Sequence, residues 1–240
     1  MNKLKCIFFD MGNTLLHFHH GKSDDEKDIQ GLKYLTEYLS KMNKDITLKA
    51  VEEEFYQKWM DGIKDRKETH KEYPIEDFLN SFLQRYKLNL SIDQCIYAIN
   101  LFYTEYREGI YYEENLYSIL KEIKSKGYKI GVISNTCYYD EVILECFKKA
   151  KIYDLIDSYT FSYSLRIGKP NERIFVEALN KMKIKPEEAI MVGDNLNSDI
   201  KPALKLGMKT VLLDRKSNSS NDEFTAYSKI SSISEVLRII

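Results

Sequence analysis

Residues 4–15, LKCIFFDMGNTL, decide the fold of this 240-residue chain. An apolar run from Cys6 to Phe9 stops at Asp10, and small and polar residues follow it. Near-continuous apolar runs of this length are typical of parallel strands that are covered on both faces. Similar runs recur at Lys129–Ser134, Tyr159–Tyr163, Ala189–Val192 and Thr210–Leu213. Helical patterns lie between the later runs, so we predict an α/β fold with a Rossmann-like, doubly wound parallel sheet.

Residues 17–110 have a different pattern. They contain one proline and no strand-like run, and their apolar residues repeat at helical spacing. Ile29, Leu32, Leu35 and Leu39 form one such series. We therefore predict a bundle of about four helices, inserted after the first strand. The expected domains are an α/β core made of residues 1–16 and 111–240 and a helical domain made of residues 17–110.

The composition argues against several classes of partner. The 36 basic and 37 acidic residues give a formal net charge of −1, which does not favour nucleic acid. No apolar run approaches the ~18 residues of a membrane helix, so we expect no membrane partner. The four cysteines, at positions 6, 95, 137 and 146, form no CxxC pair. We therefore expect no disulfide framework and no zinc site, and a reducing cytoplasm as the compartment.

Polar side chains stand where the predicted strands end. In an open parallel sheet these ends share one edge, where ligands bind. The candidates at strand ends are Asp10, Ser134, Asn135 and Asp194. Two more are Asp199, five residues after Asp194, and Lys169, which precedes the helix after the third strand. Carboxylates such as Asp10 and Asp194 suit Mg²⁺, and a carboxylate can also act as the nucleophile that accepts a phosphoryl group. The hydroxyl, the amide and the lysine are donors for phosphoryl oxygens, so the set indicates phosphoryl transfer.

Four segments, in this order, resemble the motifs of the haloacid dehalogenase superfamily. They are Phe8–Leu15, Val132–Asn135, Gly168–Phe175 and Val192–Asp199. The resemblance runs through the whole α/β part, and the helical insert resembles the superfamily's cap domain of the first type. It implies a Mg²⁺-dependent phosphohydrolase that acts on a small phosphorylated metabolite through an aspartyl-phosphate. We expect it to act as a monomer or homodimer.

The resemblance also assigns metal ligands. Asp10 would be both the nucleophile and a Mg²⁺ ligand, and Asp194 would be a further ligand. Residue 12, here Gly12, would offer its backbone carbonyl. Asp199 would act through water or by orienting Lys169.

The remaining assigned residues would bind the substrate. Ser134 and Lys169 would hold the phosphoryl oxygens, and Asn135 would support them. Lys169 would thereby also take part in catalysis.

The sequence departs from the superfamily's phosphatases at Gly12, where they carry an aspartate that acts as general acid and base. Such a group is typically worth ~10²–10⁴ in rate. The protein could act on good leaving groups or take its acid from elsewhere. His17, His19 and His20 are the candidates for a substitute acid because they lie close by in the chain.

Gly12 is also compatible with a different chemistry or with a loss of activity. Superfamily dehalogenases and phosphonate hydrolases lack this aspartate too, and the latter use a cap lysine, for which Lys22, Lys33, Lys58 and Lys64 are candidates. Alternatively, the chain is a catalytically weakened member that binds a phosphorylated ligand or a protein. We prefer the phosphatase because the two later aspartates favour a metal.

Overall fold

A computed structural model describes residues 3–69, 72–215 and 228–240 of the chain. The chain forms two compact units. Unit 1 consists of Met1–His17, Tyr111–Asn135 and Ala150–Ile240, and unit 2 consists of Phe18–Ile110 and Thr136–Lys149. Each unit is described below by itself.

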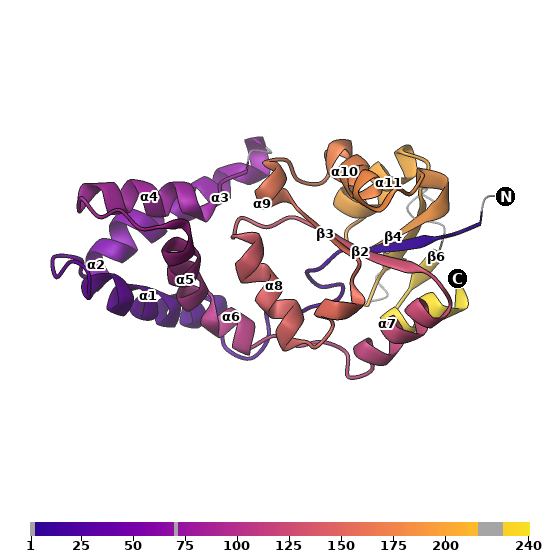
Figure 1. The fold of residues 1–240 in the computed structure, drawn as a ribbon, viewed down its shortest axis with the longest axis horizontal. Coiled ribbons are helices and arrows are strands. Elements are labelled where there is room, and N and C mark those ends of the chain that lie inside the picture. Colours follow the sequence, from indigo (N-terminus) through magenta and orange to yellow (C-terminus); the bar gives the residue numbers. More distant parts are fainter. Residues whose placement is uncertain (1–2, 70–71, 216–227) are drawn as a thin grey trace. The chain divides into compact units, whose positions relative to one another are not determined.

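Unit 1 is built on a parallel sheet of six strands among the described residues (Figure 1). The strands are β1 (Cys6–Phe9), β2 (Lys129–Ser134), β3 (Ser158–Phe161), β4 (Ala189–Gly193), β5 (Lys209–Leu213) and β6 (Ser228–Ile230). Their order in the sheet is β3-β2-β1-β4-β5-β6. The chain therefore adds strands on one side of β1 and then returns to its other side with β4. The carboxyl ends of β1 and β4 form the switch point where open α/β sheets bind ligands.

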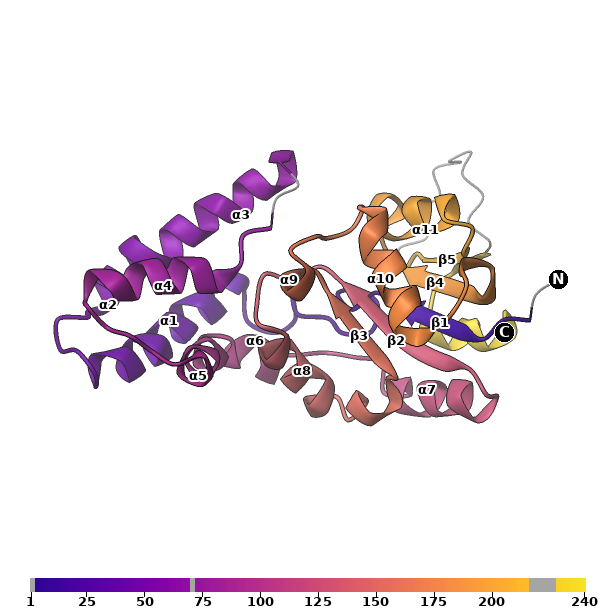
Figure 2. The ribbon, with the colours of Figure 1, turned by 45° about the horizontal axis from the view of Figure 1, so that its top comes forward.

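Helices cover both faces of this sheet (Figure 2). They are α7 (Leu116–Ser125), α10 (Glu172–Met182) and α11 (Lys201–Lys205), while the short α9 (Ser162–Leu165) directly follows β3. In both views α10 and α11 lie on one face and α7 lies on the other. The apolar side of α10 packs on strand residues such as Phe8 and Met191 in a buried core. Residues buried on both faces explain why the strand runs are almost continuously apolar.

Unit 2 is helical among its described residues. Its helices are α1 (Asp24–Ser40), α2 (Leu48–Ala50), α3 (Gln57–Thr69), α4 (Ile75–Arg85), α5 (Ile92–Phe102), α6 (Thr104–Glu108) and α8 (Asp140–Lys149). Between α2 and α3 the backbone is π-helical over Val51–Tyr56. A capping box of Ser91 and Gln94 starts α5. No helix of the described residues is both long and apolar enough to cross a membrane.

The predicted α/β class with its parallel sheet is confirmed. Three local features differ from the sequence-based expectation. Ser162 and Tyr163 begin α9 instead of extending β3, and Ser228–Ile230 adds an edge strand that the sequence does not indicate. Residues 136–149, predicted to be part of the α/β core, group with unit 2.

Candidate active site

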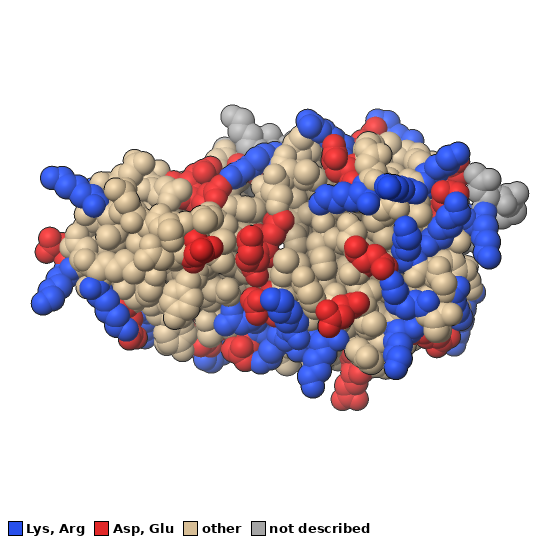
Figure 3. Space-filling model, viewed as in Figure 1, with Lys and Arg blue, Asp and Glu red and all other residues tan. Residues whose placement is uncertain are grey.

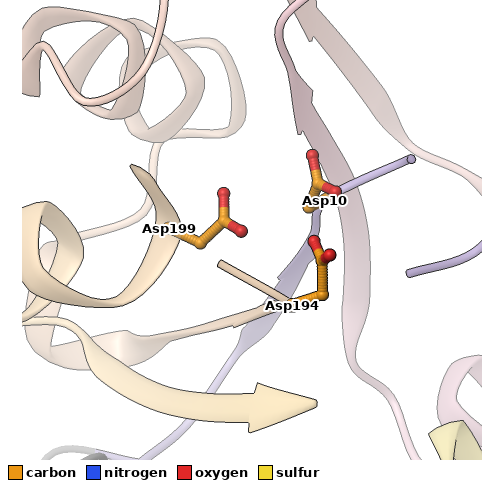
Figure 4. Close-up of side chains that lie close together, drawn as sticks. All are labelled: Asp10, Asp194 and Asp199. Atoms are coloured by element: carbon orange, nitrogen blue, oxygen red, sulfur yellow. The ribbon is translucent and has the colours of Figure 1, made fainter. Parts of the chain in front are cut away.

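Three carboxylates meet at the switch point of the sheet (Figure 4). Asp10 directly follows β1, Asp194 directly follows β4, and Asp199 lies in a π-helical segment, Leu196–Ile200, that continues into α11. One oxygen from each carboxylate lies within 4.8 Å of the others. Parallel pairing explains the meeting of Asp10 and Asp194, because Phe9 is in register with Val192. The sequence places these side chains 184 residues apart, and the sheet brings them together.

Lys169 joins two of these carboxylates. Its Nζ donates to Asp10 Oδ1 at 2.5 Å and to Asp199 Oδ1 at 2.6 Å. All three side chains are buried. Buried charges are stable only when they are paired and hydrogen-bonded, and here one ammonium serves two carboxylates. Lys169 therefore holds two carboxylates of the site together. Among the described residues it is the only cation in contact with Asp10.

Asn135 fixes the backbone of Lys169. The Asn135 amide donates to the Lys169 carbonyl at 2.8 Å, and the Lys169 N–H donates to Asn135 Oδ1 at 2.7 Å. This two-way contact ties the end of β2 to the segment that precedes α10. Ser134, at the last position of β2, is buried beside it. Ser134 and Asn135 thus stand at the carboxyl end of β2, and Lys169 stands in the connection between α9 and α10, all within unit 1.

A cap that we did not predict from the sequence holds Asp199 in place. Asn195 accepts hydrogen bonds from the N–H groups of Asn197 and Ser198 and so caps the π-helical segment. The Asn195 N–H donates to Asp199 Oδ2 at 3.0 Å. Gly193 makes room for this carboxylate, because a Cβ there would lie 2.4 Å from Asp199 Oδ2. An asparagine followed by Asn197 and Ser198 at the end of a strand is the signal that could have indicated the cap.

A second unpredicted contact involves the turn after Asp10. Asn13 adopts a left-handed backbone with φ of 57°, a conformation that asparagine tolerates better than most residues. Its N–H donates to the carbonyl of Leu16 at 2.9 Å. Its side chain lowers the pKa of Asp194, against the larger raising effects of burial and of Asp199. The turn therefore also favours the ionised form of the carboxylate that follows β4.

The electrostatics of the cluster favour a cation. Burial, together with the charge of Asp199, raises the pKa of Asp10 above its ordinary value, although Lys169 opposes the shift. Burial would lower the pKa of Lys169, but the Asp10 and Asp199 carboxylates raise it well above its usual range. Burial and Asp199 also raise the pKa of Asp194. Three carboxylates and one ammonium carry a formal charge of −2, which a divalent ion with oxygen ligands would balance.

Gly12 lies in the turn beside Asp10 with open space around it. A Cβ built on it would meet no atom within 4 Å, and its φ is not in the left-handed region. The neighbouring Thr14 hydroxyl is buried and makes no hydrogen bond to a described residue. The Thr14 carbonyl accepts from Arg215 Nη2 at 3.1 Å, which anchors the turn.

The histidines and lysines proposed from the sequence lie as follows. His17 belongs to unit 1 and packs against Tyr111. His19 and His20 are exposed in unit 2, and His19 pairs with Asp24. The four lysines considered for a Schiff base, Lys22, Lys33, Lys58 and Lys64, are all exposed. A lysine that is buried in unit 2 is Lys27, which donates to the Phe18 carbonyl at 2.7 Å.

A family model and several known proteins match large parts of the chain. A model of haloacid dehalogenase-like hydrolases matches residues 4–207. The chain is 40% identical over 100 residues to a glyceraldehyde 3-phosphate phosphatase of Methanothermobacter thermautotrophicus, covering 42% of this chain and 43% of that protein. It is 28% identical over 159 residues to (S)-2-haloacid dehalogenase 4A of Burkholderia cepacia, covering 61% and 68%. The chain thus spans less than half the length of the first of these relatives.

A solved structure resembles the whole chain. It is a HAD phosphatase from Thermococcus onnurineus, with a TM-score of 0.64 and 20% identity. The superposition covers 98% of this chain and 97% of that one. At this level of identity the likeness shows a shared fold.

Proposed function

Because the chain belongs to the haloacid dehalogenase-like hydrolases, we propose that it is a Mg²⁺-dependent phosphohydrolase for a small phosphorylated metabolite. The observation that carries the proposal is the cluster of Asp10, Asp194 and Asp199 around Lys169 at the switch point of the sheet. The name of the archaeal relative, a glyceraldehyde 3-phosphate phosphatase, supports phosphomonoester chemistry.

Asp10, Asp194 and the backbone carbonyl of Gly12 are the groups we assign to hold the metal, with Asp199 acting through water or through Lys169. The fit rests on three converging carboxylates whose formal charge, after Lys169 is counted, is −2. When bound, a magnesium ion supplies charge stabilisation for the phosphoryl oxygens and for the attacking carboxylate. Hard oxygen donors of this kind are the ones that Mg²⁺ selects.

The protein's own residues would carry the reaction. A carboxylate oxygen of Asp10 attacks phosphorus and the bond to the leaving oxygen breaks, which gives an aspartyl-phosphate. Water then attacks phosphorus, frees Asp10 and releases inorganic phosphate. Lys169 and Ser134 donate to the phosphoryl oxygens, and Asn135 keeps Lys169 in position through its two backbone contacts.

The test is to replace the nucleophile. Asp10→Asn removes the charge of the attacking group at nearly constant volume, so phosphate release from p-nitrophenyl phosphate and acetyl phosphate should fall to the buffer rate. Asp154→Asn, an exposed change in the same unit, is the matched control and should retain activity. Removing Mg²⁺ with a chelator should abolish activity, and adding it back should restore it. Undiminished hydrolysis by Asp10→Asn, with its fold verified by circular dichroism, would show that the nucleophile is assigned wrongly.

A dehalogenase is the second candidate, because the Burkholderia cepacia relative with that name aligns over 68% of its length. A carboxylate nucleophile such as Asp10 can also displace a halide. Haloacids are therefore included in the same panel, with and without Mg²⁺. Halide release that is independent of the metal, without any phosphate release, would favour this candidate. A member that only binds its ligand would bind phosphate or a phosphoester and turn over none of the panel.

We propose a small phosphorylated molecule as the partner, rather than nucleic acid. Acidic and basic side chains are interspersed over the face shown in Figure 3. We also propose that the protein acts as a monomer or homodimer. We propose a cytoplasmic location, which is consistent with the four free cysteines.

A further inference from the structure

We propose that Arg215 is a positioning residue of the reaction. It stands two residues after the end of β5, and it holds in place the turn that carries Asp10 and the Gly12 carbonyl. This inference rests on the proposed function and adds to it a residue that lies outside the carboxylate cluster. It follows from two contacts of one guanidinium group and from the hydrogen bonds within the turn.

The Arg215 guanidinium joins two segments that are far apart in the sequence. Its Nη2 donates to the Thr14 carbonyl at 3.1 Å, and its Nη1 donates to Glu113 Oε1 at 2.5 Å. The same Glu113 oxygen accepts from the Ile233 N–H at 3.4 Å. A guanidinium presents its donors in a rigid planar fork, so the position of one segment is tied to that of the other.

The turn transmits a displacement of Thr14 to the residues beside the nucleophile. The Met11 carbonyl accepts hydrogen bonds from the N–H groups of residues 14–16, at 2.9–3.3 Å. Met11 lies between Asp10 and Gly12 in the chain. Because Thr14 is 1% exposed, removing the guanidinium takes a donor from its carbonyl in a place with almost no access to water. The turn would then have to shift or open, and the nucleophile would move with it.

The second contact ties the turn to the segment by which the chain re-enters unit 1. The chain leaves this unit after His17 and returns to it at Tyr111. These two residues exchange backbone hydrogen bonds of 2.8 and 3.0 Å, and Glu113 follows two residues later. Arg215 and the pairing of His17 with Tyr111 therefore hold the two connecting segments together. The turn beside the nucleophile is thereby braced against displacement of either segment.

Positioning of this kind affects the attack on phosphorus more than the binding of the substrate. Ser134 and Lys169, to which we assign the phosphoryl oxygens, lie at the end of β2 and between α9 and α10, outside the turn. The described contacts of Arg215 are with Thr14 and Glu113, so it acts through the turn. A misplacement of a reacting group by about 1 Å can lower the rate about 10²-fold. Loss of the guanidinium should therefore lower kcat and leave KM almost unchanged.

The experiment compares Arg215→Met with Lys229→Met in the whole chain. Lys229 forms a salt bridge of 2.6 Å with Asp214, the neighbour of Arg215, and is the matched control. We measure kcat and KM for p-nitrophenyl phosphate at saturating Mg²⁺, and the affinity for Mg²⁺ by calorimetry without substrate. Arg215→Met should lower kcat about 10- to 100-fold, change KM less than about threefold and weaken Mg²⁺ binding about tenfold, the effects typical of residues that support metal ligands. Lys229→Met should leave all three unchanged.

Two conservative variants separate positioning from a general loss of stability. Arg215→Lys keeps the charge but lacks the planar fork, so it should recover part of the kcat that Arg215→Met loses. Glu113→Gln keeps the contact of the guanidinium with Thr14 and should lower kcat less than Arg215→Met does. Circular dichroism at the assay temperature verifies that each variant is folded. If Arg215→Met is not folded, a fall in kcat at constant KM in Arg215→Lys and Glu113→Gln decides the question.

Three results would overturn the inference. One is a folded Arg215→Met whose kcat, or whose affinity for Mg²⁺, equals that of Lys229→Met. Another is a rise in KM at unchanged kcat, because Arg215 would then bind the substrate and would not position the turn. The third is an unchanged kcat in Arg215→Lys and Glu113→Gln where these two variants decide.

The failure of this inference can be distinguished from the failure of the proposed function. In the three cases above Asp10→Asn would still be inactive, so the proposed phosphohydrolase would stand. Hydrolysis of p-nitrophenyl phosphate by Asp10→Asn, or no hydrolysis of any phosphorylated compound by the unmodified protein, would contradict the proposed function and this inference with it.

Discussion

Replacing Lys169 by methionine should lower the free energy of unfolding of unit 1, because the change leaves buried carboxylates without their cation. At an effective dielectric constant of about 20, each contact at 2.5–2.6 Å is worth about 6–7 kcal/mol before desolvation is subtracted. Breaking a buried pair by removing one partner typically costs about 3–5 kcal/mol net. For a protein of this size that corresponds to a fall in melting temperature of roughly 6–20 °C.

Thermal unfolding followed by far-ultraviolet circular dichroism, in the presence of a chelator, is the assay. Lys205→Met is the matched control, because Lys205 is 77% exposed and its pair with Glu172 is at the surface. Such surface pairs contribute about 0–1 kcal/mol. The fluorescence of Trp59, the single tryptophan, reports on unit 2 and should change less if the units unfold separately.

The stability lost in Lys169→Met should depend on pH, in a direction set by the pKa of Asp10. The folded-state pKa of Asp10 is raised, so its ionised form opposes folding above that pKa. The free energy of unfolding should therefore increase as the pH falls from the raised pKa of Asp10 toward the pKa that Asp10 has in the unfolded chain. The increase should be steeper in Lys169→Met. Mg²⁺ should also recover part of the loss. If Lys169→Met in chelator at neutral pH is as stable as Lys205→Met, the ammonium does not balance the cluster and the charge pairing inferred for the site is wrong.

Two further changes test the supports of the carboxylates. Asn13→Gly keeps the left-handed turn but removes the amide that lowers the pKa of Asp194. The affinity for Mg²⁺ in calorimetry should therefore fall roughly 2- to 13-fold, the range expected for the loss of one polar interaction. Unchanged affinity would show that Asn13 does not support the site. Gly193→Ala forces a Cβ against Asp199 and should lower the free energy of unfolding in urea by about 1–3 kcal/mol. Gly12→Ala meets no atom and should change that free energy by less than about 1 kcal/mol. Equal effects of the two variants would refute the close packing at Gly193.

The sheet could be predicted from sequence because its local and global signals agree. Runs such as Ala189–Gly193 are apolar, short and bounded by polar residues, which is typical of a strand buried on both faces. Ser228–Ile230 gives no such signal, because three residues with a central lysine do not form a pattern. The segment 136–149 has the spacing of an ordinary crossover helix. The segment belongs to unit 2 because of tertiary contacts, such as the hydrogen bond that the Ile75 N–H donates to the Cys137 carbonyl. A pattern read along the sequence does not contain such contacts.

The site shows a similar division. Strand ends on neighbouring parallel strands must lie close together, so the meeting of Asp10 and Asp194 could be anticipated, while the roles assigned to them stay predictions. The hydrogen bond from the Asn195 N–H to Asp199 could not be predicted, because it depends on the particular shape of the loop after β4. The same holds for the effect of Asn13 on the pKa of Asp194. Asparagine is common in turns for local reasons, so its presence alone does not reveal a longer-range partner.

The chain passes between the two units four times, after His17, Ile110, Asn135 and Lys149. Deleting residues 18–110 alone would leave α8 behind with its buried apolar residues, Val142, Ile143, Cys146 and Phe147, stripped of their partners. A transplant of the helical unit onto a related scaffold must therefore carry both pieces, and recombination between homologues would have to exchange the two together. The second pair of junctions begins directly after Asn135, so such a graft would be joined next to the residue that holds Lys169.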